Sequence, residues 1–432
     1  MNDFDTRTYT RTRVATGLTV CLLMCGGSRQ SEGTQGGRAK FPGNPSVRPA
    51  VRAVLDAVRA DEPQVAADQI RLCEIPAPPF KEAARAGAMR SAFEQIGLAN
   101  VRVDRAGNVL GERAGVSPQP RLVVAAHVDT VFPEETDVHV TRSGTVLKGP
   151  GIGDNCRGLA VLLAVARALQ RSGLQTDGPI TFVANTGEEG LGDLRGAKAL
   201  FNDTLKGRVD RFMAIDGAGL YLANTAVGSR RYRVTFKGPG GHSYAAFGTA
   251  NPIQAMGRAI AAIARLPVPG EARTTFNVGR VGGGTSINAI PTECWMEVDL
   301  RSTDAAALAA LEAQVTRAAD DAAAEENRRG GVAGAITVVR QLVGDRPPGR
   351  TPAGSPIVQT ALAAARALGL TLTPTESSTD ANVPIQLKIP AIAIGTGGRS
   401  TGPHTANETY DTTDAWRGTQ FAALTVVMLA GR

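Results

Sequence analysis

Aromatic side chains are scarce in this sequence, at 4% of its 432 residues. Proteins that stack the bases of single-stranded nucleic acid need aromatic side chains close together, so this composition argues against that class of function. The chain also has no dense block of lysine and arginine, although its formal net charge is +7. We interpret this charge as solvated surface charge, mildly attractive to anionic substrates. No nucleic-acid partner is expected.

Cysteine pairs at close spacing are absent as well. The chain has five cysteines and no C-x-x-C motif, and the five are Cys21, Cys25, Cys73, Cys156 and Cys294. This scatter argues against a disulfide framework and against a zinc site made of thiolates. It leaves the redox compartment open.

The start of the chain has an apolar run, residues 14–24, which is too short to span a bilayer comfortably. Three arginines precede it, which is typical of a signal peptide. Residues 22–25 resemble a bacterial lipoprotein cleavage box, although Met24 stands where a small residue is expected before Cys25. We therefore expect an exported or membrane-anchored bacterial protein, lipidated at Cys25. The alternative is a mis-assigned start codon ahead of a cytoplasmic protein.

Nearly continuous apolar segments predict strands that are buried on both faces. These segments are 121–126, 180–184, 211–215 and 391–394. Helical patterns alternate with them, and helices are also expected over 51–73 and 82–96. The alternation predicts an α/β fold with a mixed, mostly parallel sheet flanked by helices.

Composition and patterning divide the chain into four parts. Residues 26–49 are rich in Gly, Ser, Pro and Gln, as in a flexible tether, whereas strands exposed on one face alternate with helices between 228 and 342. The predicted parts are a signal-like segment and tether (1–48), a main domain in two pieces (49–227 and 343–432), and an inserted α+β lid or dimerisation domain (228–342), called the lid domain below.

Acidic and imidazole groups follow all four predicted strands at their carboxyl ends. In open α/β sheets this is the edge where ligands bind. In chain order the groups are His127, Asp129, Glu188, Glu189, Asp216 and His404. A further carboxylate, Asp154, lies in a glycine-rich loop before a predicted helix, where on its own it would be read as a helix cap.

Two histidines and three carboxylates, one of them bridging, form a mixed nitrogen and oxygen ligand set that suits zinc, cobalt or manganese. The sequence therefore predicts two divalent metal ions, most simply zinc, held by His127, Asp154, Glu189, Asp216 and His404. His139 has no other candidate ligands near it in the sequence, and it is expected to be a surface or strand residue without a role in the site.

Three residues beside the ligands are candidates for catalytic roles. Asp129 is placed to orient the imidazole of His127. Glu188 is placed to act as a general base on water that two metal ions activate, although a solvated acidic turn is the simpler reading of Glu188-Glu189 alone. His242, in a glycine-rich loop of the lid domain, can stabilise an oxyanion or be a turn residue.

Asn288 and Arg301 supply an amide and a guanidinium from the lid domain. Arg301 can grip a substrate carboxylate with two hydrogen bonds, or it can be a structural partner of Asp299 or Asp304. The sequence favours neither interpretation of Arg301 over the other.

The motifs together resemble the co-catalytic zinc exopeptidases and amidohydrolases, such as aminoacylase, glutamate carboxypeptidase, acetylornithine and succinyl-diaminopimelate deacylases, and tripeptidase T. The resemblance runs from about residue 50 to the end. It is carried by His127-Val-Asp129-Thr-Val, Gly-Pro-Gly-Ile-Gly-Asp154, Gly187-Glu-Glu-Gly, Asp216-Gly, Gly-Pro-Gly-Gly-His242-Ser and Gly402-Pro-His404.

The resemblance implies a role for each matching residue. His127 and Asp216 would hold one ion, Glu189 and His404 the other, and Asp154 both, with Glu188 as base and Asp129 behind His127. In dimeric relatives the histidine matching His242 reaches the partner's site, residues matching Asn288 and Arg301 contact the substrate carboxylate, and the turn with Gly397 lines the substrate. Many relatives have Asp-Lys-Gly-Gly where Asn155-Cys156-Arg157-Gly158 stands, so Cys156 is either a thiol near the metals or a packing neighbour.

These observations predict a metallopeptidase or amidohydrolase whose two-part main domain is catalytic, which acts on short peptides or N-acyl amino acids and which forms a homodimer through the lid domain. Two alternatives stay open: an inactive binding protein on the same scaffold, and a metal-dependent phosphoesterase.

Overall fold

The structure is a computed structural model that describes residues 46, 48–267, 272–331 and 335–431. The signal-like segment, with its predicted lipidation site at Cys25, lies outside the described residues. Among the helices of the described part, none is long and apolar enough to cross a membrane.

The predicted α/β fold is confirmed by a nine-stranded sheet with the order β1-β2-β6-β3-β7-β17-β8-β15, in which β16 also pairs with β8. Strands β6, β3, β7 and β17 run parallel, and β1 and β2 pair antiparallel with their neighbours. Strand β8 pairs antiparallel with β17 and β15 and parallel with β16. The bounds are β1 (Ala99–Val103), β2 (Val109–Arg113), β3 (Leu122–His127), β6 (Ile180–Asn185), β7 (Arg211–Ile215), β8 (Leu222–Ala226), β15 (Gly349–Arg350), β16 (Pro374–Ser377) and β17 (Ala391–Ile394).

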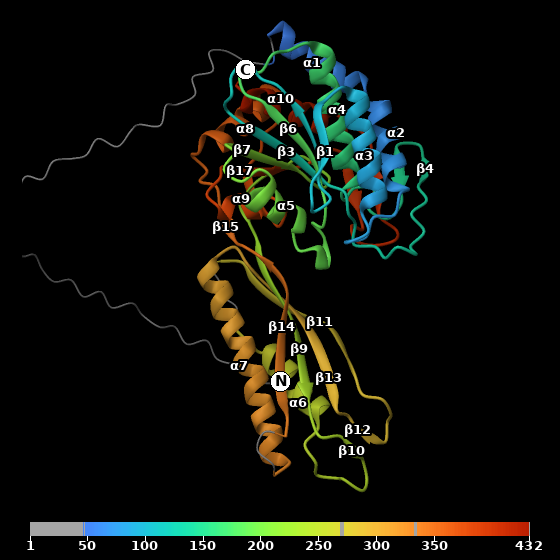
Figure 1. The fold of residues 1–432 in the computed structure, drawn as a ribbon, viewed down its shortest axis with the longest axis vertical. Coiled ribbons are helices and arrows are strands. Elements are labelled where there is room, and N and C mark those ends of the chain that lie inside the picture. Colours follow the sequence, from blue (N-terminus) through green and yellow to red (C-terminus); the bar gives the residue numbers. More distant parts are fainter. Residues whose placement is uncertain (1–45, 47, 268–271, 332–334, 432) are drawn as a thin grey trace, which may run out of the picture. The chain divides into compact units, whose positions relative to one another are not determined.

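Helices cover both faces of this sheet (Figure 1). One face packs against the larger core, which includes α1 (Pro49–Ala60), α4 (Cys156–Ser172), α8 (Pro356–Ala367) and α10 (Trp416–Leu429). The other face packs against α5 (Arg195–Ala199) and α9 (Asn382–Gln386). Because strands β3, β6, β7 and β17 are covered on both faces, they are almost wholly apolar.

The single helix predicted over residues 51–73 is wrong in one respect. The chain forms α1 and then α2 (Glu62–Cys73), with Asp61 between them, and α3 (Ala83–Ile96) follows. Pro63 explains the break, because proline lacks an amide hydrogen and is tolerated only in the first turn of a helix.

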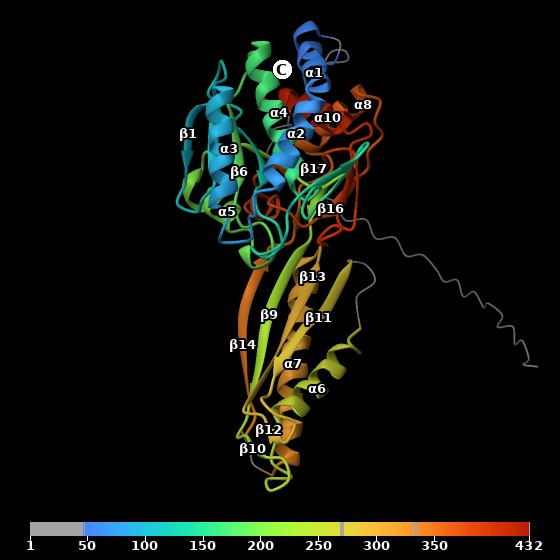
Figure 2. The same ribbon diagram turned by 90° about the vertical axis from the view of Figure 1, so that its right-hand side faces the viewer.

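The predicted end of the lid domain at residue 342 falls within β14, which continues to Arg346, so the lid domain is taken as residues 228–346 from here on. It is a four-stranded antiparallel sheet with the order β11-β13-β9-β14 and two helices on one face (Figure 2). Its strands alternate buried and exposed side chains, as a sheet covered on one face requires. The bounds are β9 (Gly228–Lys237), β10 (Gly241–His242), α6 (Pro252–Ile263), β11 (Thr274–Gly283), β12 (Ala289–Ile290), β13 (Glu293–Ser302), α7 (Ala305–Arg329) and β14 (Thr337–Arg346).

A small sheet with the order β18-β19-β5-β4 completes the fold. It joins β4 (Thr141–Ser143) and β5 (Val146–Lys148) to β18 (Arg399–Thr401) and β19 (Thr409–Asp411). The loop with Asp154 and the loop with His404 therefore lie side by side, although they are far apart in the sequence.

Although the scatter of the cysteines argues against a disulfide framework, one pair of them forms a disulfide. Cys73, at the end of α2, is bonded to Cys156, at the start of α4, and their Cα atoms are 5.4 Å apart. Both residues are fully buried, and Cys294 is a free buried cysteine. The two residues are separated by 83 positions, so their spacing could not reveal a contact that packing of α2 on α4 creates. Cys156 is thus neither a free thiol nor only a packing neighbour.

Candidate metal centre

Strands β3, β6, β7 and β17 are neighbours in the sheet, and each one ends beside the same site. Strand β3 ends at His127, Glu188 and Glu189 follow β6, and Asp216 follows β7. The loop after β17 and β18 carries His404. The parallel arrangement thus gathers at one edge the groups that the sequence scatters over almost three hundred positions.

Two clusters of side chains share Asp154. In the first, Nε2 of His127 lies 3.2 Å from Oδ1 of Asp154 and 3.4 Å from Oδ1 of Asp216. In the second, Nε2 of His404 lies 3.2 Å from Oδ2 of Asp154 and 3.0 Å from Oε1 of Glu189. Each oxygen of Asp154 therefore faces a different histidine, which is the arrangement of a carboxylate that bridges two cations.

The donor set fits a pair of divalent ions. Ligand atoms of His127, Asp154 and Glu189 all lie within 4.8 Å of one another. The buried Oδ1 of Asp154 has no hydrogen-bond partner in the described part of the chain, because its approach to His127 lacks hydrogen-bond geometry. A buried carboxylate oxygen without a donor is costly, and a cation would satisfy it.

The loop that carries Asp154 is held by Glu408, a buried residue that the sequence analysis missed. Its carboxylate accepts hydrogen bonds from the backbone amides of Gly151 and Gly153, both at 2.9 Å, and of Asp154 at 3.2 Å. Gly151 has a φ of 77°, which favours glycine. Burial and the nearby Asp154 raise the pKa of Glu408 to about 7.

Asp129 contacts His127, as predicted, and also contacts the turn that carries Glu188 and Glu189. The Nδ1 atom of His127 lies 3.0 Å from the backbone oxygen of Asp129 and 3.7 Å from its carboxylate. Because a carbonyl only accepts, Nδ1 carries a proton and Nε2 faces Asp154 and Asp216. The carboxylate of Asp129 accepts from the backbone amides of Glu188, at 3.0 Å, and Glu189, at 2.7 Å. One residue therefore orients both the imidazole and the acidic turn.

The surplus of carboxylates raises the pKa of both histidines. Hydrogen bonds to Asp154 and Glu189 raise the pKa of His404 to about 10. Burial opposes the charge of His127, but Asp129, Asp154 and Asp216 outweigh it, so its pKa is well above the usual value. Burial likewise acts against ionisation of Asp154, but the two histidines hold its pKa low. The carboxylates thus favour positive charge beside both imidazoles, and a divalent ion would supply it.

Glu188 is buried beside the clusters and contacts an arginine that the sequence analysis missed. Nη1 of Arg346 donates to Oε1 of Glu188 at 2.7 Å, and Nη2 donates to the backbone oxygen of the same residue. Burial raises the pKa of Glu188 well above its usual value, and Arg346 opposes this rise. No local motif surrounds Arg346. Its position at the end of a strand that leads back to the main domain is the one signal in the sequence that could have singled it out.

A second missed pair lies behind the ligands. Nδ2 of Asn185, at the end of β6, donates to Oδ2 of Asp380 at 2.6 Å, and both residues are buried. Burial raises the pKa of Asp380 to about 7, against the effect of His127. The signal in the sequence was slight: Asp380 precedes a short helix, as a capping residue would.

A cavity of about 230 Å³ opens onto the clusters. Arg231, Arg301 and Arg346 also line this cavity. Nε of Arg301 donates to Asp299 at 2.7 Å, so the predicted ion pair with Asp299 forms and Arg301 also lines the cavity. Nε of Arg231 contacts the other oxygen of Asp299 at 3.2 Å. Asp299 therefore orients two guanidinium groups beside the cavity.

Three predicted site residues, His242, Asn288 and Gly397, do not line this cavity. His242 and Asn288 are neighbours at one end of the lid domain, where β10 pairs with β12 and the amide of Ser243 donates to the Asn288 carbonyl at 2.9 Å. Gly397 packs between Gly219 and α10, with a φ of 76°, and its backbone bonds to Gly219. His139 is exposed and contacts Glu74 at 3.1 Å.

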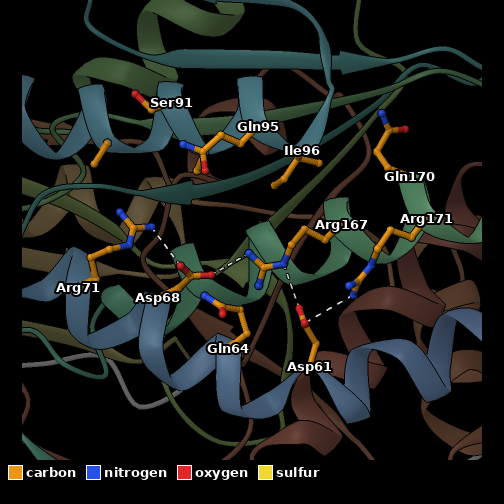
Figure 3. Close-up of a pocket in the computed structure, with 12 residues that line it drawn as sticks. Asp61, Gln64, Asp68, Arg71, Ser91, Gln95, Ile96, Arg167, Gln170 and Arg171 are labelled. Atoms are coloured by element: carbon orange, nitrogen blue, oxygen red, sulfur yellow. Dashed lines mark hydrogen bonds and ion pairs between the residues drawn. The ribbon is translucent and has the colours of Figure 1, made fainter.

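A larger hollow, of about 700 Å³, lies between α2, α3 and α4 (Figure 3). Its charged groups pair with one another: Arg167 donates to Asp61 at 3.0 Å and to Asp68 at 2.7 Å, and Arg71 and Arg171 also contact these acids. This network ties α4 to α2, and it contains none of the candidate metal ligands.

Comparisons with known proteins agree with this geometry. The model of "Peptidase family M20/M25/M40" matches residues 123–427. The uncharacterized protein YqjE of Bacillus subtilis is 26% identical over 231 residues, which are 52% of this chain and 60% of YqjE, so the match spans about three-fifths of that relative.

Solved structures share the whole fold. A tripeptidase from Staphylococcus aureus has a TM-score of 0.71 at 22% identity, over 86% of this chain and 99% of that one. A dinuclear metal-binding peptidase from Bacillus subtilis has a TM-score of 0.62 at 20% identity, over 86% and 99% of the two chains.

Proposed function

Because the chain belongs to peptidase family M20/M25/M40, and is thus a metallopeptidase or amidohydrolase, we propose that it cleaves a peptide or amide bond in short peptides or N-acyl amino acids with two bound metal ions. The observation that carries the proposal is Asp154, whose two oxygens each face one histidine of two adjoining clusters.

In this proposal His127 and Asp216 would hold one ion, Glu189 and His404 would hold the other, and Asp154 would contribute a carboxylate oxygen to each. Imidazole and carboxylate ligands suit zinc first, with cobalt and manganese as alternatives. When bound, such ions lower the pKa of water and polarise a scissile carbonyl.

Glu188 is the proposed general base. It is buried at the cavity wall next to Glu189, so it can take a proton from the attacking water and pass it to the leaving amine. Asp129 fixes this turn through the backbone amides of Glu188 and Glu189, and its backbone oxygen holds Nδ1 of His127 so that Nε2 points toward Asp154 and Asp216.

The cationic wall of the cavity supports a substrate with a free carboxylate. Arg301 has its Nε engaged by Asp299, which fixes the direction of the guanidinium fork. A guanidinium held in this way can bind a carboxylate by donating hydrogen bonds from its two terminal nitrogens. Short peptides and N-acyl amino acids both carry such a group.

We also propose a homodimer in which the lid domain of one copy completes the site of the other. Arg231 of β9 contacts Gly190 beside the ligands, whereas β9 continues for six more residues to Lys237 before His242 is reached. Six residues of strand span roughly 20 Å, so His242 and Asn288 lie far from their own metal centre. In a second copy they can meet the substrate carbonyl and carboxylate, whereas Gly397 would act through the backbone of its turn.

The Cys73–Cys156 disulfide supports export, which is the proposed location. Disulfides persist in oxidising compartments and are rare in the bacterial cytoplasm. Cell fractionation followed by mass analysis of the mature amino terminus tests this. An unprocessed chain confined to the cytoplasm would refute it.

The function is tested by metal analysis of the purified protein together with a screen of dipeptides, tripeptides, N-acyl amino acids and aryl phosphates. We expect about two divalent ions per chain and turnover of peptides or N-acyl amino acids that a chelator abolishes. Preferential turnover of aryl phosphates would support the phosphoesterase alternative. Metal binding without any turnover would support the alternative of an inactive binding protein.

The assigned base is tested by Glu188→Ala. We expect the variant to keep about two metal ions and to lose activity by a factor on the order of 10³, because the ligands stay and the proton acceptor goes. Retained turnover would show that another group takes the proton.

A further inference from the structure

The chain returns from the lid domain to the main domain through β14, and this strand ends on the candidate base. Arg346 is the last residue of β14 and is only 3% exposed. Its guanidinium holds Glu188 twice, through the carboxylate Oε1 at 2.7 Å and through the backbone oxygen. Nη1 also donates to Oγ of Ser378 at 3.2 Å, which fixes the guanidinium from the main domain.

Two further contacts attach the lid domain to the same acidic turn, residues 188–193. Nη1 of Arg231, on β9, donates to the backbone oxygen of Gly190 at 2.9 Å. The backbone amide of Asp345, next to Arg346 on β14, donates to Oδ1 of Asp193 at 2.9 Å. Both strands that connect the lid domain to the main domain are therefore hydrogen-bonded to the turn that carries the base and a metal ligand.

We propose that Arg346 is a positioning residue for Glu188, and that through it the placement of the lid domain sets the orientation of the general base. This rests on the proposed function, in which Glu188 accepts the proton. Arg346 fixes one carboxylate oxygen and the adjoining backbone, so the other oxygen is left to face the reacting water. A shift of the lid strands moves the guanidinium and the base together, which links lid movement to proton transfer.

An alternative role for a buried arginine beside this cavity is to bind the substrate. The contacts argue against it, because both terminal nitrogens of Arg346 are already engaged by Glu188, and Nη1 by Ser378 too. Arg301, by contrast, contacts Asp299 through Nε. The two arginines should therefore separate in kinetics: Arg346 acts on kcat and Arg301 on KM.

The test compares Arg346→Gln and Arg346→Lys with Arg340→Gln in the full-length, metal-loaded enzyme. Arg340 is a matched control, since it lies on the same strand but pairs with Asp320 and the backbone of Thr316 on α7. We expect Arg346→Gln to lower kcat about 100-fold with KM changed less than about threefold and two metals retained. Arg346→Lys should recover about tenfold of this loss, because an ammonium can meet Oε1 but cannot span both acceptors. The control should stay within about twofold of wild type.

A double-substitution cycle separates positioning from a general structural effect. If Arg346 acts through Glu188, adding Arg346→Gln to Glu188→Gln should change the residual rate by less than about twofold. A normal kcat in Arg346→Gln beside an inactive Glu188→Gln would overturn the inference alone. So would loss of metal in proportion to activity, or a rise in KM at unchanged kcat.

Two other outcomes are also decisive. If Arg346→Gln does not fold, Arg346→Lys decides the matter, and a wild-type kcat in that variant overturns the inference. Full activity in Glu188→Gln would overturn the proposed base and this inference with it.

Discussion

Glu408 is a buried carboxylate that holds the loop of the candidate metal site without being one of the candidate ligands. Three backbone amides of the loop that carries Asp154 point at its two oxygens. In Glu408→Gln one of these oxygens becomes an amide donor that faces other donors, so the loop should lose its fixed conformation. Residues that support ligands in this way typically change metal affinity by about 10- to 100-fold.

We therefore expect Glu408→Gln to bind metal about 10- to 100-fold more weakly while the chain stays folded. Competition with a chromogenic chelator measures the affinity, and circular dichroism checks the fold. Glu134→Gln is the control, since Glu134 pairs with Lys81 at the surface. Equal affinity in both variants would show that Glu408 does not shape the loop.

At the same scale, the sequence revealed groups that follow strands and missed groups that pack from a distance. Residues such as His127 and Asp216 could be predicted because an apolar run marks each buried strand, and ligands bind at the carboxyl ends of such strands. Arg346, Glu408 and the Cys73–Cys156 pair depend on contacts between segments far apart in the chain, and no local pattern encodes them. The contact of Asp129 with the acidic turn was hidden for the same reason.

Helix α7 of the lid domain is tied to the start of α6 by one buried carboxylate, Glu326. Oε1 of Glu326 accepts from the backbone amide of Asn251 at 2.9 Å, and its carboxylate also contacts Arg258 and Arg329. Burial raises the pKa of Glu326, but these donors outweigh it and the pKa is lowered overall. A lowered pKa in the folded state means that ionised Glu326 stabilises the fold. This contribution is present above its ordinary value of 4.5 and is lost as the pH falls through the lowered value.

We expect Glu326→Gln to reduce the free energy of unfolding by about 2 kcal/mol at pH 7, since it removes charge-assisted hydrogen bonds. The difference from wild type should shrink once the pH falls below about 4.5. Urea denaturation across this range measures it. The neighbouring Glu325→Gln serves as control, because Glu325 pairs with Arg258 at the surface and should contribute at most about 0.5 kcal/mol. A pH-independent difference would contradict the assigned cause.

The disulfide joins two elements, the end of α2 and the start of α4, next to the loop with Asp154. Replacing both Cys73 and Cys156 by serine should lower the free energy of unfolding by about 2–4 kcal/mol, because a closed loop of this length restricts the unfolded chain. Thermal unfolding with and without reductant tests this. Reductant should lower the midpoint temperature of unfolding of the wild type and leave that of the double variant unchanged. If reductant has the same effect on both proteins, the disulfide does not form.

Among the elements, the sheet strands were easier to predict than helix ends or the lid boundary. The strands β3, β6, β7 and β17 are apolar throughout because both faces are covered, which leaves a clear signal. The break between α1 and α2 depends on one proline within an otherwise helical pattern. Strand β14 continues to Arg346 because it pairs with β9 as far as Ser229, and this partner is not visible in β14's own sequence.

In the whole molecule, the lid domain has one end at the metal centre and its other end away from it. Arg231 and Arg346 engage residues 188–190, while His242 and Asn288 lie beyond the opposite end of β9. The side chains of Tyr244, Phe247 and Ile287 beside them are almost fully exposed, at 88%, 90% and 103%. A single chain therefore places the candidate base and the candidate ligands together but leaves His242, the proposed oxyanion donor, among apolar groups that suit contact with a second copy.

Complementation between two inactive variants tests this arrangement. Glu188→Ala lacks the base but keeps His242, and His242→Ala lacks the donor but keeps the base. In a heterodimer of the two, one site combines an intact main domain with an intact lid tip, and the other has neither. Heterodimers purified through two different affinity tags should therefore have about half of the activity of the wild-type dimer, although each parent is nearly inactive. If purified heterodimers are no more active than the parents, or if the enzyme is fully active as a monomer, each chain must complete its own site and His242 has another role.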